Sequence, residues 1–110
     1  MNINQAIRLL KGMDELEPMN HKTKSLKGFQ LRTILLLIVI AKKEGENQAY
    51  FKENLNWTFN SVSTHTRTLI EYGFIVQGDD ERDPRYQSKR LYLAPKVRKV
   101  LEEQLSLEIN

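Results

Sequence analysis

The spacing of hydrophobic residues predicts two helices in the first half of the chain. The first is predicted near the N-terminus from residues that share one helical face, namely Ile3, Ala6, Ile7 and Leu10. The second is predicted from Ser25 to Lys43, and it contains an apolar run over residues 34–41. That run alone would also suit a buried strand, but the apolar pattern continues back to Phe29, and Gly45 provides a stop. We therefore expect a central helix that is buried on nearly all sides.

A third helix is predicted over Gln48–Leu55. Its apolar side is expected to consist of Ala49, either Tyr50 or Phe51, and Leu55. A short polar break, Asn56–Trp57, follows this helix. We expect the indole of Trp57 to fill the corner between two helices rather than to stack on a base.

A fourth helix is predicted over Phe59–Tyr72, directly after the break. Thr58 is a favourable N-cap for it, and Gly73 is a favourable residue to end it. Its inward face is expected to consist of Val62, Leu69 and Ile70. Two helices joined by so short a turn predict a helix-turn-helix over residues 47–72.

The last third of the chain predicts a β-hairpin and a final helix. Phe74–Val76 suits a strand, and the polar segment Gly78–Lys89 suits a loop. Leu91 and Leu93 alternate with polar residues, as expected of a returning strand. Pro95 suits the first turn of a helix. The apolar face of that helix is expected to consist of Val97, Val100, Leu101 and Leu105.

This order of elements predicts a mainly α fold with a small β-hairpin (α+β), a winged helix-turn-helix. We expect one domain over residues 1–110. The hairpin and its loop would form a wing over residues 74–94. Segments 1–20 and 95–110 would form short flanking helices.

Composition and charge narrow the class of protein. The 110 residues carry a net charge of +3 and no cysteine, which excludes disulfides and thiolate metal sites. Residues 21–43 hold no acid, so the lysines at 22–27 suit either phosphate contact or simple solvation. The apolar run at 34–41 is too short to span a membrane, and residues 1–5 do not suit a signal peptide. We expect a soluble, cytoplasmic protein.

Three stretches carry a family resemblance. Residues 55–69 read LNWTFNSVSTHTRTL and residues 71–75 read EYGFI, which resembles the second half of bacterial winged-helix repressors. Residues 83–96 read DPRYQSKRLYLAPK, which resembles the wing of the multiple-antibiotic-resistance-regulator (MarR) family. That family typically has Asp-x-Arg followed by Ser-Lys-Arg-Leu-Tyr-Leu-Thr. The sequence departs from this pattern at Ala94, where the family prefers Thr, and at Val97, where it prefers Gly.

A recognition helix reads base edges in the major groove with short polar side chains near its N-terminus. The polar positions predicted to face outward in the fourth helix are Asn60, Ser61, Ser63, Thr64, His65, Arg67 and Thr68. Asn pairs bidentately with adenine and Arg with guanine, so this surface suits base contact. The alternative is an ordinary solvated face, although such faces usually favour Glu and Lys.

The predicted wing carries basic residues beside acidic ones. The candidates for DNA contact are Arg82, Arg85, Lys89 and Arg90. The loop would be merely solvated if its charges neutralise one another. Alternatively, a wing-tip Arg enters the minor groove while a nearby Asp holds its guanidinium. The resemblance points to Arg85 with Asp83, and to Arg82 as second choice.

These features predict a double-stranded DNA-binding transcriptional regulator, a repressor acting as a homodimer on an inverted repeat. The residues expected at its two-fold axis are Ile3, Ile7, Leu10, Val97, Leu101 and Leu105. The alternative is an interaction module of a replication-initiation or polymerase-associated assembly of plasmid or phage type. We expect no enzymatic activity, because Ser61 and His65 have no orienting acid or oxyanion hole nearby in the sequence. We expect no cofactor and no metal.

Overall fold

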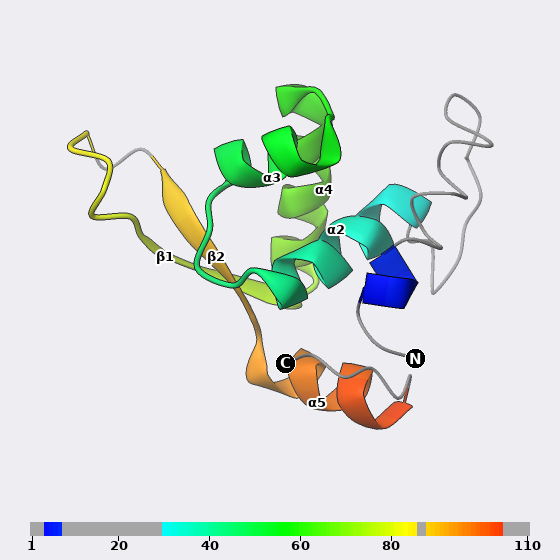
Figure 1. Ribbon diagram of the computed structural model, residues 1–110. Helices are drawn as coiled ribbons and strands as arrows, with labels where there is room; N and C mark the ends of the chain where they lie inside the picture. The colour runs from blue at the N-terminus through cyan, green and yellow to red at the C-terminus, as the bar shows by residue number, and fades with distance from the viewer. Residues whose placement is uncertain (1–3, 8–29, 86–87, 105–110) are drawn as a thin grey trace.

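The computed structural model describes residues 4–7, 30–85 and 88–104. In this part of the chain a short helical segment, residues 4–7, precedes the named elements. These are the helices α2 (Leu31–Lys42), α3 (Gln48–Leu55) and α4 (Phe59–Glu71), the strands β1 (Ile75–Asp79) and β2 (Lys89–Leu93), and the helix α5 (Pro95–Gln104). The order confirms the predicted winged helix-turn-helix, mainly α with one small hairpin. Figure 1 shows the hairpin extending away from the group formed by α2, α3 and α4.

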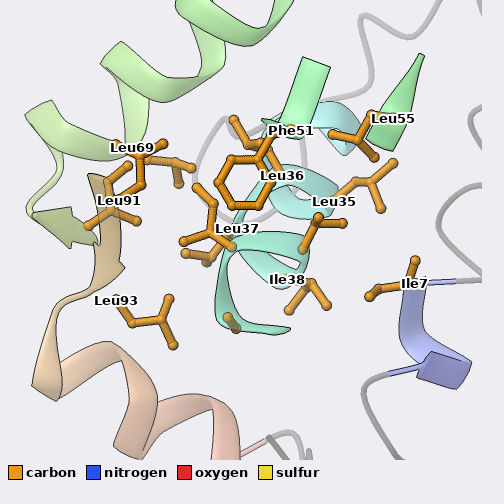
Figure 2. Packing of buried hydrophobic residues seen from close by; sticks show 14 of the residues in the cluster. Ile7, Leu35, Leu36, Leu37, Ile38, Phe51, Leu55, Leu69, Leu91 and Leu93 are labelled. Carbon is orange, nitrogen blue, oxygen red and sulfur yellow. The ribbon is translucent and has the colours of Figure 1, made fainter. Parts of the chain in front are cut away.

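Helix α2 forms the centre of the core. Residues 35–41 are all buried, which confirms the predicted buried helix and excludes a strand. The helix begins later than the predicted start at Ser25, because Gln30 has extended backbone angles (φ −79°, ψ 158°) and serves as the N-cap. Figure 2 shows side chains from α3, α4 and β2 packed around α2, among them Phe51, Leu69 and Leu91.

Side-chain caps fix the two helices that follow. Asn47 caps α3, since its Oδ1 accepts a hydrogen bond of 3.0 Å from the Tyr50 amide. Asn56 ends α3 in the left-handed conformation (φ 57°). Phe51 is buried, but Ala49 is exposed, so the prediction of Ala49 on the apolar side is wrong. Ala49 lies two positions before Phe51, so its Cβ points about 200° around the helix axis from the buried Phe51 side chain.

Helix α4 begins at Phe59, as the sequence predicts, and ends at Glu71, one residue before the predicted end, with Tyr72 as its C-cap. The Thr58 hydroxyl accepts from the Ser61 amide at 3.1 Å, and Gly73 adopts φ +74°. Gly73 N donates to the Ile70 carbonyl at 2.9 Å, and Phe74 N donates to the Leu69 carbonyl at 2.9 Å, which is a Schellman ending. The prediction that Ile70 faces inward is wrong. Its side chain is 36% exposed, because one residue beyond buried Leu69 the helix has turned by about 100°.

The hairpin is anchored to the loop between α2 and α3. Strands β1 and β2 pair antiparallel, with Ile75 opposite Leu93 and Asp79 opposite Lys89. The other edge of β2, away from β1, is hydrogen-bonded to this loop. The Leu91 carbonyl accepts from Gly45 N at 2.9 Å, and Leu91 N donates to the Glu46 carbonyl at 2.9 Å. The base of the wing therefore has a fixed position relative to the helix-turn-helix.

The flanking segments pack on this core within the single chain. Ile7 and Leu101 are buried, and Val97 is partly buried against the core cluster. The sequence predicts these three residues at a two-fold axis. The core of the same chain buries Ile7 and Leu101 and partly covers Val97, so Ile7 and Leu101 are not exposed for contact with a second copy. The other three residues predicted at a two-fold axis, Ile3, Leu10 and Leu105, lie outside the described residues. None of the helices in the described ranges is long and apolar enough to cross a membrane.

Candidate nucleic-acid interface

The outer face of α4 carries polar side chains along its first three turns. Asn60, Thr64 and Arg67 are exposed at helical spacings that align them along one face. Ser63 and Thr68 flank this row and are partly buried. We call the surface formed by Asn60, Ser63, Thr64, Arg67 and Thr68 the α4 outer face. It offers amide, hydroxyl and guanidinium groups, which are the groups that read base edges.

Ser61, predicted as a base contact, lies at the side of this face toward α2. Its Oγ accepts a hydrogen bond of 3.1 Å from Nη1 of Arg32. The Arg32 guanidinium also lies over the Trp57 ring, 4.6 Å from its centroid. Trp57 is buried, which confirms its predicted place in the core of the helix-turn-helix. Arg32 therefore holds the first turn of α4 against α2.

His65 does not belong to the outer face. Its side chain is 7% exposed, and Nδ1 lies 2.8 Å from Oγ1 of buried Thr33. The imidazole also packs against Trp57, with 5.8 Å between ring centroids. The prediction that His65 faces outward is wrong, because positions 62, 65, 66 and 69 form the buried side of α4.

A buried carboxylate organises the base of the wing. Asp80 is 1% exposed, and Arg82 donates to it from the backbone N (3.0 Å), Nε (2.8 Å) and Nη2 (3.0 Å). Asn47, the cap of α3, donates to Oδ2 at 3.1 Å, and Arg82 Nη1 donates to Glu46 Oε1 at 3.2 Å. The hydrogen bonds from Arg82 hold the pKa of Asp80 well below its usual range, and those same bonds raise the pKa of Arg82. We call Asn47, Asp80 and Arg82 the wing-base network.

The two basic residues of β2 are also paired. Arg90 donates from Nη1 to the Gly45 carbonyl at 3.2 Å and from Nη2 to Glu81 at 3.3 Å. Lys89 donates to Asp79 at 2.7 Å across the hairpin. The sequence predicts Arg82, Lys89 and Arg90 as DNA contacts. Within the chain, their side chains hydrogen-bond to acidic residues and to the Gly45 carbonyl, and these hydrogen bonds hold the wing together.

The tip of the wing is shaped by Asp83. Its two carboxylate oxygens accept from the Arg85 amide at 3.0 Å and from the Ser88 amide at 2.8 Å. The Arg85 side chain is 78% exposed, and its Nε lies 4.0 Å from Asp83 Oδ1. The predicted pair of Arg85 with Asp83 is present, and the side chain of Arg85 is more exposed than those of Arg82, Lys89 and Arg90.

The sequence matches no protein-family model and no curated protein. The MarR transcriptional regulator from Methanosarcina mazei Go1 superposes with a TM-score of 0.67 at 21% identity, over 94% of this chain and 72% of that chain. FabT from Streptococcus pneumoniae, solved in complex with DNA, superposes with a TM-score of 0.62 at 21% identity, over 94% of this chain and 73% of that chain. This chain has the winged-helix fold of the MarR regulators. The resemblance seen in its wing sequence thus extends to the three-dimensional structure of the MarR fold.

A third structure with the MarR fold, the zinc-responsive ZitR from Lactococcus lactis, superposes with a TM-score of 0.63 at 18% identity, over 94% of this chain and 73% of that chain. In the part of the present chain that the structure describes, no cluster of three His, Asp or Glu side chains is placed to hold a metal ion. The candidate interface consists of the α4 outer face and the wing tip.

Proposed function

We propose that this protein is a transcriptional regulator that binds double-stranded DNA through α4 and the wing. The observation that carries the proposal is the pairing of two features in one MarR fold. The α4 outer face exposes Asn60, Thr64 and Arg67, and the wing presents Arg85 from a tip that Asp83 holds. FabT, which has this fold, was solved in complex with DNA, and that supports the same partner here.

The two features would have different tasks. Helix α4 would lie in the major groove, where Asn60 suits adenine and Arg67 suits guanine. Arg85 would meet the DNA backbone or the minor groove, where a guanidinium needs no particular base. The wing-base network would keep the distance between these two contacts constant, because it joins the wing to the cap of α3.

We also propose a cytoplasmic homodimer that represses transcription from an inverted repeat. A protein dyad on a DNA dyad places half-site centres about one helical turn, 10–10.5 bp, apart or a multiple of it. Since Ile7 and Leu101 pack inside one chain, the partner surface would rest on other residues of the flanking segments, such as exposed Val100. A clean monomer in sedimentation at micromolar concentration would overturn both the dimer and the inverted repeat.

The deciding experiment is selection of bound duplexes from a random pool, followed by titration of the selected duplex and a scrambled one. We expect Asn60→Ala to cost roughly 1–3 kcal/mol on the selected duplex and little on the scrambled one. Asn54→Ala removes the same group from an exposed site on α3, outside the α4 outer face, the wing and the flanking segments, and should change neither affinity. Equal losses on both duplexes would overturn the assignment of α4, and no salt-dependent binding to any duplex would overturn the function.

A further inference from the structure

We propose that Phe59, the first residue of α4, determines specificity by contacting the 5-methyl group of a thymine in the major groove. This inference rests on the proposed DNA-binding function and adds a residue and a base to it. Neither the polar pattern of the fourth helix nor the wing sequence points to Phe59.

Phe59 is placed at the start of the α4 outer face. The Thr58 cap fixes the first turn of α4 through its 3.1 Å hydrogen bond to Ser61 N. The Phe59 side chain is 55% exposed, more than any other large hydrophobic side chain in the described residues. It precedes Asn60 and lies one turn before Ser63, so its ring borders the polar row. The N-terminal half of a recognition helix is the part that meets base edges.

Packing in the hydrophobic core does not explain why residue 59 is a phenylalanine. Val62 and Trp57, its nearest apolar neighbours in sequence, are buried in the core, whereas Phe59 stays outside that cluster. A single exposed hydrophobic residue needs no explanation by itself. An aromatic ring beside amide, hydroxyl and guanidinium groups at the N-terminal end of α4 is different, because it adds a large apolar group to a surface made of polar side chains.

The chemistry of the major groove identifies the matching group. A phenyl ring has no hydrogen-bond donor or acceptor for the nitrogen and oxygen atoms of base edges. Stacking on a base would require that base to leave its stack, which costs a few kcal/mol. The one apolar group that an intact duplex presents in the major groove is the thymine methyl, and a phenyl side chain is suited to it.

The test replaces each thymine of the selected duplex, one at a time, by deoxyuridine, which lacks only the methyl group. We expect that deoxyuridine at one or two of these positions weakens binding by the wild-type protein about fourfold. This is the loss in affinity expected when one buried methyl group is removed. Phe59→Ala should bind the thymine duplex about fourfold more weakly and lose its response to deoxyuridine at those positions. Phe59→Leu should keep the response, since leucine is also apolar.

Val76→Ala is the control, because Val76 is 47% exposed and lies on β1, outside the α4 outer face, the wing tip and the flanking segments. It should respond to deoxyuridine as wild type does. Phe59→Ala should keep the thermal unfolding midpoint of wild type, because the ring it removes is outside the core. A wild type that ignores every deoxyuridine, or a Phe59→Ala that still responds, would overturn the role of Phe59 even where Asn60→Ala confirms specific binding. Failure to select any duplex would instead overturn the proposed function, and this inference with it.

Discussion

Thr33 of α2 and His65 of α4 meet in a buried hydrogen bond, with 2.8 Å between the threonine Oγ1 and the histidine Nδ1. The neighbouring Arg32 donates to Ser61 one turn earlier in α4. Two consecutive residues of α2 therefore fix how α4 is rotated about its own axis. That rotation decides which α4 side chains face outward, so a buried polar pair contributes to the candidate interface without belonging to it.

His65→Ala is expected to lower the free energy of unfolding by roughly 1–3 kcal/mol, since it leaves the buried Thr33 hydroxyl without this partner. Thr33→Val should lower it as well, and the double variant should lose less than the sum of the two. Urea unfolding of the four proteins measures this coupling. Thr64→Ala, an exposed neighbour, should stay within about 0.5 kcal/mol of wild type. Additive losses would show that the pair is not coupled.

Gly73→Ala is expected to destabilise the protein by about 1–2 kcal/mol through backbone strain alone. Gly73 adopts φ +74°, while a Cβ placed there would meet nothing within 4 Å. Gly73→Asn should lose less, because asparagine tolerates the left-handed region better than alanine does. Chemical denaturation of both variants makes the comparison. The same loss for Ala and Asn would argue against strain as the cause.

The wing-base network should make stability depend on pH in the acid range. The folded-state pKa of Asp80 is lowered, chiefly by hydrogen bonds from Arg82, so the unfolded chain takes up the proton first as the pH falls. The contribution of Asp80 is therefore complete above about pH 5, and it is lost as the pH falls below about 4 toward the folded pKa. Asp80→Asn should lower stability at neutral pH and flatten the decline in acid.

The measurement is the free energy of unfolding at a series of pH values from neutral down into the acid range. Glu71→Gln is the control, because its carboxyl group is exposed at the end of α4 and lies outside the wing-base network. It should keep the acid decline of wild type. If Asp80→Asn declined as steeply as wild type, another carboxylate would be responsible.

Capping residues, helix terminators and hydrophobic periodicity were sufficient to predict the order of the helices and strands. The cap Thr58, the terminator Gly73 and the first-turn Pro95 stand where the structure uses them, because caps depend on a few adjacent backbone groups. The alternation of Leu91 and Leu93 likewise places β2, since one face of that strand packs on the core.

Side-chain partners far along the chain were not predictable. His65 has a polar side chain, which suggests exposure, but its partner Thr33 lies 32 residues away and makes burial tolerable. Asp80 stands in an acidic stretch that reads as solvated, and its contact with Asn47 spans 33 residues. Ile70 shows the opposite error. Its apolar side chain predicts burial, but Ile70 follows buried Leu69 by one residue, and the rotation of the helix by about 100° leaves its side chain exposed.

Arg85→Ala is expected to weaken binding to selected and scrambled duplexes alike. Its guanidinium is exposed at the wing tip, so it can neutralise a phosphate or enter the minor groove without reading a base. The slope of log affinity against log salt should fall by about one ion on both duplexes, and the free energy of unfolding should not change. Lys99→Ala removes the same charge from an exposed site on α5 and should leave the slope as it is. An Arg85→Ala protein with the affinity and slope of wild type would make the wing tip a solvated loop, and DNA contact would then rest on α4 alone.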